Sequence, residues 1–272
     1  MINKWVAEKT NDKITEIVSA DSVDAQLVLV NAVYFKGDWL SKFNVHCTND
    51  QDFYISPNET VNVKMMYTKE DFLTGANDEL NCQAIELPYE GESLSMFILL
   101  PDQAATSLSD LENKLTSDDL INVREKFRMS SYEVNLSLPR FKLDEKISLS
   151  EMLAAMGMSD LFVPSVADLS GIDGSKELCV SQVVHRAVVE VNEEGTEAAG
   201  ATNVFLCSLC LDSFCANHPF LFFIQDKATR SILFLGRLVK PPAVELSDET
   251  KARRARAASR KAKDKTSCCN TH

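Results

Sequence analysis

The sequence has no apolar run of membrane-spanning length. Residues 1–6 lack the apolar core of a signal peptide, and no run of about 18 apolar residues marks a membrane span. We therefore expect no membrane partner and a cytoplasmic or nuclear protein, with secretion lacking a signal peptide left open. Eight cysteines are scattered without a tight framework, which fits reduced thiols in such a compartment.

Motifs of the common enzyme classes are also missing. There is no GxGxxG or GxxxxGKS/T phosphate loop, no HExxH zinc motif and no GxSxG nucleophile motif. Cys207 and Cys210 form a C-x-x-C pair with Cys215 and His218 downstream, but they lie outside any βαβ pattern and lack the usual zinc spacing. We interpret them as loop and core thiols, and we expect neither enzyme activity nor a metal or cofactor.

Positive charge is scarce over most of the chain and concentrated at its end. The net charge is −12; residues after 250 carry eight Lys or Arg and one acid, Asp264, so this tail has +7 and the remainder, by subtraction, −19. An acidic body argues against nucleic-acid binding, because phosphates are neutralised by clustered cations. We expect nucleic-acid contact only through the basic tail, residues 251–265, with a solvated helix or a disordered end as the alternative.

The sequence also lacks a stretch with the composition of an interdomain linker. The chain has 272 residues, 45% of them hydrophobic, and no Pro/Gly/Ser-rich stretch divides it. We expect one domain over residues 1–242, followed by a basic extension over residues 243–272.

Apolar periodicity predicts both strands and helices. Leu27–Phe35 is an almost continuous apolar run, which predicts a strand buried on both faces. Because strands and helices follow one another irregularly, we expect an α+β domain with large mixed or antiparallel sheets. An amphipathic opening helix is indicated by helical spacing of Ile2, Trp5, Val6, Ile14, Ile17 and Val18. Further strands are predicted at Val61–Met66, Cys82–Leu87, Leu94–Leu100, Tyr132–Leu138, Leu178–Val191, Pro219–Ile224 and Ser231–Leu238, and further helices at Leu108–Leu115, Leu120–Phe127 and Ile147–Met158.

A run of small residues follows the predicted strand at Val183–Val191. At a two-residue period its threonines and small residues share one face, while Glu197 falls on the other. Small side chains meet no steric block in a crowded sheet, so the segment could enter one as a new strand. Outside a sheet it would be a mobile loop, because it has little apolar area to dock. The alternatives are a switch segment and a plain flexible connector, made of Glu193, Glu194, Gly195, Thr196, Glu197, Ala198, Ala199, Gly200, Ala201 and Thr202.

This segment occurs among ordered sequence signatures, which are Ile2–Val6, Leu29–Trp39, Glu86–Tyr89, Leu94–Pro101, Leu138–Phe141, Ala167–Ile172, Val184–Ala187, Phe214–Ile224 and Phe234–Leu238. With these signatures the chain resembles the serpin family, most closely its ovalbumin-like, intracellular branch. The resemblance implies a serpin domain of several sheets with an exposed reactive-centre loop. The opening helix of the chain matches an element deep inside the family fold, so we expect the N-terminal helices and outer strands to be missing.

The resemblance implies a monomeric inhibitor that acts as a suicide substrate. A protease cleaves the loop and forms an acyl-enzyme, and the hinge then inserts as a strand and traps the protease. The family pattern places the cleaved bond sixteen positions beyond the hinge Glu193, at Leu209–Cys210, whereas a count back from His218 gives Leu206–Cys207. Leucine favours chymotrypsin-, elastase- or cathepsin G-like serine proteases, or a papain-like cysteine protease. The alternative is a non-inhibitory or inactive truncated serpin that serves as an interaction protein.

The resemblance also assigns roles around the sheet that would open. Insertion would occur between the strands at Leu27–Phe35 and Leu178–Val191, with the opening helix over them. Asn31 and His185 match a buried polar pair that holds neighbouring strands. Trp39, Arg140 and Glu193 match the cluster where the hinge first enters the sheet, and a salt link between Arg140 and Glu193 would restrain premature insertion.

Overall fold

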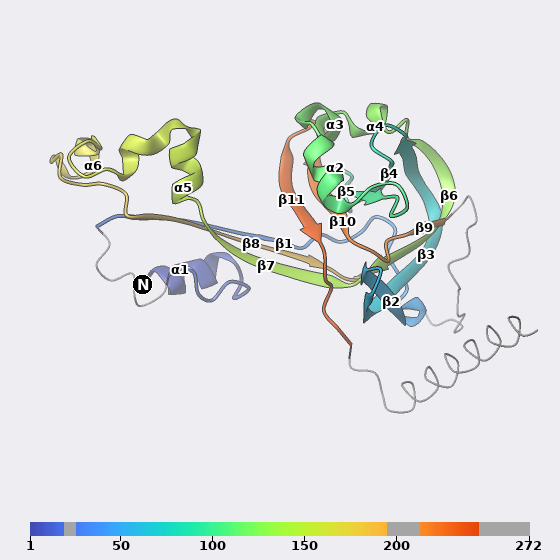
Figure 1. Cartoon of the computed structure of the whole chain (residues 1–272). Coiled ribbons are helices and arrows are strands. Elements are labelled where there is room, and N and C mark those ends of the chain that lie inside the picture. Colours follow the sequence, from blue (N-terminus) through green and yellow to red (C-terminus); the bar gives the residue numbers. More distant parts are fainter. Residues whose placement is uncertain (19–25, 195–212, 245–272) are drawn as a thin grey trace, which may run out of the picture. The chain divides into compact units, whose positions relative to one another are not determined.

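A computed structural model describes residues 1–18, 26–194 and 213–244 (Figure 1). These residues form two compact units. The smaller unit contains Met1–Gly37 and Phe141–Asn192, and the larger contains Asp38–Arg140 and the chain from Glu193 onward. None of the helices in the described ranges is long and apolar enough to cross a membrane.

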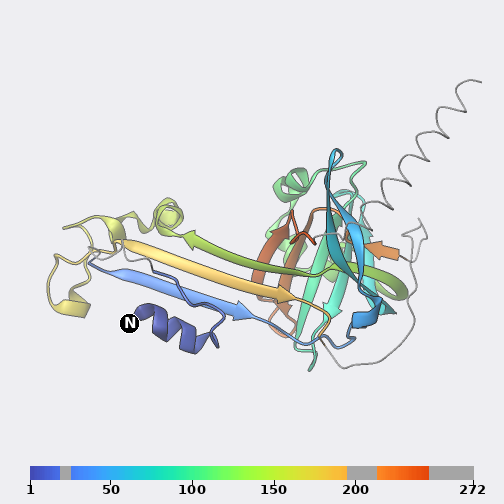
Figure 2. The same cartoon turned by 90° about the horizontal axis from the view of Figure 1, so that it is seen from below.

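The smaller unit is built on a three-stranded sheet with the order β1-β8-β7. β1 (Val28–Phe35) runs parallel to β8 (Gln182–Val191), and β7 (Phe141–Ser148) pairs with β8 in the antiparallel direction. Helix α1 (Ile2–Lys9), blue in Figures 1 and 2, lies along β1 and β8. Between β7 and β8 the chain forms α5 (Ser150–Leu153), a π turn (Ala154–Met158), a 3-10 turn (Ser159–Phe162) and α6 (Ser170–Asp173).

The apolar run of β1 predicted a strand buried on both faces, and this prediction is wrong. One face packs against a cluster of Val6, Ile14, Ile17, Val184 and Val188, through Val28, Val30, Ala32 and Tyr34. On the other face, Leu29 is 41% exposed and Asn31 is also exposed. Val33 and Phe35 on this face are half-buried, so the exposure is confined to the first half of the strand.

The opening helix is shorter than its apolar spacing predicts. It ends at Lys9, and Asn11 and Asp12 then adopt left-handed φ angles of 50° and 57°, which interrupt a helix. Ile14 and Ile17 are fully buried, but they pack from an irregular segment. The same set of apolar side chains reaches the sheet without continuous helix.

The larger unit contains an eight-stranded sheet with the order β11-β10-β5-β4-β3-β6-β9, in which β2 also pairs with β3. The 19-residue β3 is long enough to pair with β2, β6 and β4 along successive stretches. All pairs are antiparallel except β6 with β9. The strands are β2 (Asn49–Ser56), β3 (Glu59–Asn77), β4 (Cys82–Pro88), β5 (Leu94–Pro101), β6 (Ser130–Pro139), β9 (Ser213–Cys215), β10 (Phe220–Asp226) and β11 (Ile232–Leu238).

Three short helices cover one face of this sheet: α2 (Leu108–Lys114), α3 (Ser117–Ile121) and α4 (Val123–Lys126). Leu111 and Phe127 from the helical segments pack against Phe97 of β5 and Phe223 of β10. The two sheet rings are stacked with centroids 5.0 Å apart. Stacked buried aromatic rings add about 0.5–1.5 kcal/mol to the stabilisation from burial alone.

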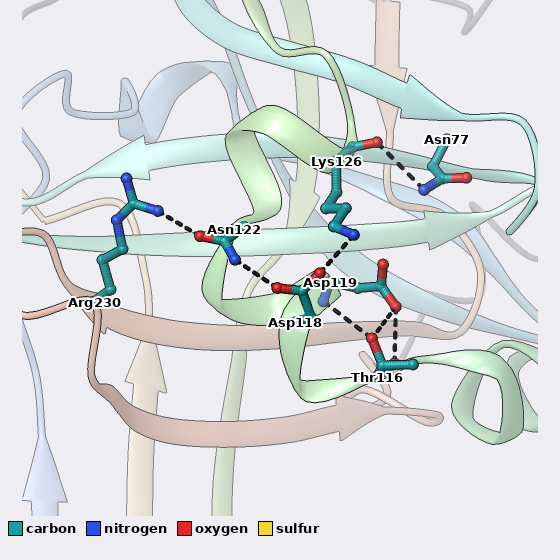
Figure 3. Close-up of polar contacts among 7 residues, drawn as sticks. All are labelled: Asn77, Thr116, Asp118, Asp119, Asn122, Lys126 and Arg230. Atoms are coloured by element: carbon teal, nitrogen blue, oxygen red, sulfur yellow. Dashed lines mark hydrogen bonds and ion pairs between the residues drawn. The ribbon is translucent and has the colours of Figure 1, made fainter.

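Polar contacts fasten α3 and α4 to the strands (Figure 3). Asp118 accepts a 2.7 Å hydrogen bond from Asn122 and lies 2.5 Å from the Lys126 ammonium. The Lys126 contact and the Asn122 hydrogen bond lower the pKa of Asp118. Arg230, from the β10–β11 turn, donates to Asn122, and Asn77 at the end of β3 donates to the Lys126 carbonyl. Asn122 ends α3 and begins α4, which divides the single helix predicted here.

The predicted α+β class with several sheets is confirmed, and each strand predicted beyond β1 has a counterpart. Strands β2, β7 and β9 were not predicted. β7 occupies the start of the helix predicted at Ile147–Met158, which is reduced to α5 and a π turn containing Gly157 at φ 101°. β7 does carry apolar residues at a two-residue period, Phe141, Leu143 and Ile147, and this signal was missed. β2 begins with four polar residues, and it pairs along its length with β3.

No disulfide joins the four described cysteines, which are Cys47, Cys82, Cys179 and Cys215. Burial raises the pKa of Cys82 to about 12, so this thiol stays protonated and unreactive at neutral pH. Cys207 and Cys210 lie outside the described residues.

Candidate functional site at the hinge

The carboxylate of Glu193 is held in the larger unit, two residues beyond the end of β8. Glu193 is 1% exposed. Arg140 donates from Nε to Oε2 over 2.8 Å and also from Nη2 to the same oxygen. Thr48 donates from Oγ1 to Oε1 over 2.7 Å. Both carboxylate oxygens therefore have a donor, as an ion in a buried position requires.

Backbone contacts position both partners of Glu193. Arg140 lies between β6 and β7, and its backbone N–H donates to the Lys64 carbonyl of β3 over 2.8 Å. Thr48 follows a 3-10 turn at Val45–Cys47, which Asn44 caps by accepting from the backbone of His46. Segments far apart in the sequence thus converge on one carboxylate.

Solvent reduces the strength of this contact without removing it. The Arg140 side chain is 48% exposed, whereas the Glu193 side chain is 2% exposed. A hydrogen bond to a charged group contributes about 1.5–3 kcal/mol, and exposure of one partner favours the lower end. Removal of the arginine would leave a buried carboxylate with one neutral donor. Thr48, Arg140 and Glu193 are hereafter called the Glu193 latch.

The ion pair that the resemblance implied between Arg140 and Glu193 is present, while its role in restraining insertion stays a prediction. Thr48 was not predicted. It lies 145 positions from Glu193 in the sequence, and a lone threonine before a polar strand carries no pattern that connects it to the hinge.

Trp39 belongs to an aromatic cluster in the same unit. It is 3% exposed and stacks on Tyr89, with centroids 4.6 Å apart and planes inclined by 12°. Phe43 contacts it edge-on at 6.3 Å, and Trp39 also forms an isolated β-bridge with Tyr89. Burial raises the pKa of Tyr89, so its phenol stays neutral. The cluster fixes the chain between β1 and β2.

Asn31 and His185 lie opposite each other on the paired strands β1 and β8. The expectation of a buried pair is wrong: Asn31 is exposed and His185 is half-buried. Within the described ranges, the two side chains form no hydrogen bond with each other. Cover over this face of the sheet is uneven: Leu29 of β1 is exposed, whereas Val183 and Val189 of β8 are buried.

The two strands that would receive the hinge are closed against each other. β1 and β8 are paired from Val28 opposite Gln182 to Phe35 opposite Val189. Any strand inserted between them must first separate these pairs and then replace their hydrogen bonds on both sides.

Most of the predicted hinge and both predicted cleavage bonds lie outside the described residues. Of the ten hinge positions, Glu193 and Glu194 are described; Gly195, Thr196, Glu197, Ala198, Ala199, Gly200, Ala201 and Thr202 are not. The same holds for Leu209–Cys210, for Leu206–Cys207 and for the basic tail.

The family profile and the sequence relatives that match this chain agree on one family. The profile of the family described as "Serpin (serine protease inhibitor)" matches residues 1–241. The chain is 49% identical to leukocyte elastase inhibitor of Bos taurus and 46% identical to that of Homo sapiens, over 88% of its own length. It spans 66% and 65% of the lengths of these two relatives.

Solved structures agree with the sequence relatives. The crystal structure of uncleaved ovalbumin superimposes with a TM-score of 0.78 at 37% identity, covering 88% of this chain and 61% of that one. Native protease nexin-1 with heparin gives a TM-score of 0.76 at 34% identity, covering 88% of this chain and 65% of that one. With its sheets and its sequence both matched over most of its length, the chain belongs to the serpin family and is ovalbumin-like.

Proposed function

We propose that this chain inhibits a serine protease by serving as a suicide substrate. The protease serine Oγ attacks the carbonyl carbon of the cleaved bond, an ester to the serine forms, and the peptide nitrogen leaves as an amine carrying the proton. Residues 195–202 then enter between β1 and β8 as a new strand. The observation that carries the proposal is the buried Glu193 carboxylate with its two partners, directly before the small-residue segment.

The Glu193 latch controls when insertion begins. While Arg140 and Thr48 hold the carboxylate, the residues after it are anchored at their first position. Opening the latch costs the charge-assisted hydrogen bonds, and insertion breaks the hydrogen bonds between β1 and β8. The inserted strand then forms backbone hydrogen bonds with both β1 and β8, so one ladder is replaced by two. Cleavage provides the freedom that the intact loop lacks, so insertion follows cleavage.

The proposed partner is a protease whose specificity pocket accepts leucine. Both candidate bonds, Leu209–Cys210 and Leu206–Cys207, follow a leucine. Chymotrypsin-, elastase- and cathepsin G-like enzymes have apolar pockets for such a residue, and papain-like cysteine proteases are the other candidates. The relatives' name, leukocyte elastase inhibitor, supports the elastase-like choice.

Incubation with pancreatic elastase and with chymotrypsin tests the proposal. We expect a covalent complex that survives denaturing electrophoresis. Its mass should be that of the protease joined to the part of the chain before the cleaved bond, because the part after the bond is released as a peptide. Mass spectrometry of the released peptide identifies the bond. Leu209→Asp should abolish the complex and Leu206→Asp should leave it; the reverse result assigns the other bond.

A matched variant separates inhibition from cleavage. Thr196→Arg places a charged side chain on the face that would be buried on insertion, so we expect cleavage at the wild-type rate without a stable complex. A stable complex with this variant would contradict insertion. Ala201→Ser, a conservative change in the same segment, should behave as wild type.

The exposure of β1 favours a second candidate, an interaction protein without inhibitory activity. The sheet that must accept the new strand has three strands in the described chain, and one face of β1 is uncovered. If insertion cannot be completed, proteases will cleave the loop as an ordinary substrate, with no complex and no change in melting temperature.

We further propose that residues 243–272 are an extension outside the serpin domain, since the family profile ends at residue 241. Within it, residues 251–272 carry +7, a charge that suits nuclear targeting or nucleic-acid contact, in a protein of the cytoplasm or nucleus. Deletion of residues 251–272 should then abolish nuclear accumulation of a fluorescent fusion; unchanged distribution would contradict this role.

A further inference from the structure

The larger unit contains a cavity of about 730 Å³ that the inhibitory mechanism does not use. Its walls come from the β2–β3 turn, the loop between β5 and α2, the start of β10 and the end of β11. A backbone hydrogen bond of 2.8 Å from Tyr54 to the Asn217 carbonyl joins two of these walls. Sites for small molecules typically occupy about 300–1,000 Å³, so the volume suits such a ligand.

The lining is mainly apolar. Among the described residues that line the cavity, one side chain, Arg237, carries a formal charge at neutral pH when His218 is neutral. The hydroxyl of Ser107 is already used, because it caps α2 in a reciprocal contact with Asp110. The apolar walls are formed by Tyr54, Ile55, Pro101, Leu108, Pro219 and Val239.

His218 contributes an imidazole ring to the wall. Its Nε2 lies 2.8 Å from the Pro101 carbonyl oxygen, and its Nδ1 lies 3.0 Å from Oδ1 of Asn217. Burial lowers the pKa of His218, although the Pro101 carbonyl and nearby Asp102 oppose this effect. Burial therefore disfavours a second positive charge in the lining at neutral pH.

Arg237 has hydrogen-bonding capacity left for a ligand. Its Nη1 lies 3.2 and 3.3 Å from the two carboxylate oxygens of Glu112. Its remaining guanidinium nitrogens have no partner among the described residues, and the side chain is 59% exposed. A guanidinium presents donors on more than one edge, so a second acid can bind without displacing Glu112.

We propose that this cavity binds a small amphipathic anion: an aromatic or aliphatic body within the apolar walls and one carboxylate or sulfonate on Arg237. A single cation beside an otherwise uncharged lining matches a ligand with one negative charge. A neutral ligand of the same size would bury the same apolar surface but lose the charge-assisted hydrogen bond.

Two fluorescent probes that share their rings test this directly in the full chain. 8-Anilinonaphthalene-1-sulfonate carries one negative charge, and N-phenyl-1-naphthylamine carries none. We expect one bound sulfonate probe per chain, with an affinity about tenfold above that of the neutral probe at low salt. Its affinity should fall as salt is added, while that of the neutral probe should not fall.

Variants make the test specific to this cavity. Arg237→Gln should weaken the sulfonate probe about tenfold and leave the neutral probe unchanged. Arg230→Gln is the matched control, because Arg230 is 51% exposed, pairs with Glu125 at 3.2 Å and lies outside the cavity lining. Equal loss in the two variants, or no loss in Arg237→Gln, would overturn the proposal.

Filling the cavity gives an independent outcome. Ala104→Trp places an indole in the exposed loop of the lining and should weaken both probes. Ser109→Trp is the second variant, used if the first lowers the melting temperature. Undiminished binding of both probes in a filled, folded variant would show that they bind other apolar surface, such as exposed Leu233 and Leu235, and would overturn the proposal.

Discussion

Two eight-residue apolar strands, β1 of the smaller unit and β5 of the larger, differ sharply in burial. β5 is buried at every position after its first, whereas β1 has no fully buried residue. β5 lies between two strands and beneath helices, while β1 ends its sheet order and is covered on one face. Neighbours therefore decide burial. The larger unit is a packed scaffold that holds Glu193, whereas the sheet of the smaller unit has a partly exposed edge strand.

The largest effect should come from the core of the larger unit. Phe223 is fully buried and stacked on Phe97, so Phe223→Ala should lower the free energy of unfolding by about 3–5 kcal/mol. Leu29→Ala, on the uncovered face of β1, should cost less than about 1 kcal/mol. Urea unfolding followed by circular dichroism measures both. Similar losses of unfolding free energy in the two variants would mean that β1 is covered in solution. The difference in burial between the two units would then be contradicted.

A buried carboxylate in the larger unit should show the next effect. Glu86 is 1% exposed and accepts from Arg124 at 2.6 and 2.8 Å and from Ser95 at 2.7 Å. Glu86→Gln leaves the arginine without its counter-ion. We expect a loss of about 2–3 kcal/mol, below the range for fully buried pairs because Arg124 is half-exposed.

Asp144→Asn is the counterpart in the smaller unit. Asp144 pairs with Arg186 at 2.7 Å, and both side chains are partly exposed, so we expect about 1 kcal/mol or less in the same urea experiment. A larger loss of unfolding free energy for Asp144→Asn than for Glu86→Gln would contradict the tighter packing assigned to the larger unit.

The Glu193 latch should give a smaller change in stability. Arg140→Gln removes the positive charge from a buried carboxylate and should cost about 1–2 kcal/mol, since Arg140 is half-exposed. Arg128→Gln is the control: its partner Asp78 is 2.6 Å away but 83% exposed, and exposed pairs contribute about 0–1 kcal/mol. Equal melting temperatures for the two variants would show that the Glu193 latch contributes no more stability than an exposed ion pair.

The smallest effect should be a pH dependence in the smaller unit. Contacts with Lys176 and then Ser170 lower the pKa of Asp168 from 3.8 to about 2. A depressed carboxyl pKa stabilises the folded state above the unfolded value, and this contribution is lost as the pH falls from 3.8 toward 2. In Asp168→Asn the decline in melting temperature over that window should be slightly shallower than in wild type. An identical decline would contradict the assigned cause.

The sequence predicted strands well where apolar residues continue or alternate, as at β4, β5 and β10. It could not show what lies over a strand, so β1 was predicted to be buried on both faces. It also missed β2, because the first four residues of this strand are polar and mask the short run Phe53-Tyr54-Ile55; pairing with β3 extends the strand over both parts.

The candidate site was predictable only in part. A glutamate before small residues marked the hinge, and the family resemblance connected it to Arg140. Thr48 was not accessible, because no local pattern connects a hydroxyl to a carboxylate 145 residues away. The exposure of Asn31 was missed for the same reason as that of β1: burial depends on neighbours that the strand's own residues do not specify.

The most direct test of the account is the melting temperature of the chain before and after a single cleavage at the leucine bond, with amide hydrogen exchange of β1 and β8 measured on both forms. We predict that the cleaved chain melts higher and that amides on the facing edges of β1 and β8 remain protected, now by the inserted residues 195–202. An unchanged melting temperature, with rapid exchange throughout residues 195–202 after cleavage, would contradict insertion and the inhibitory function proposed from it.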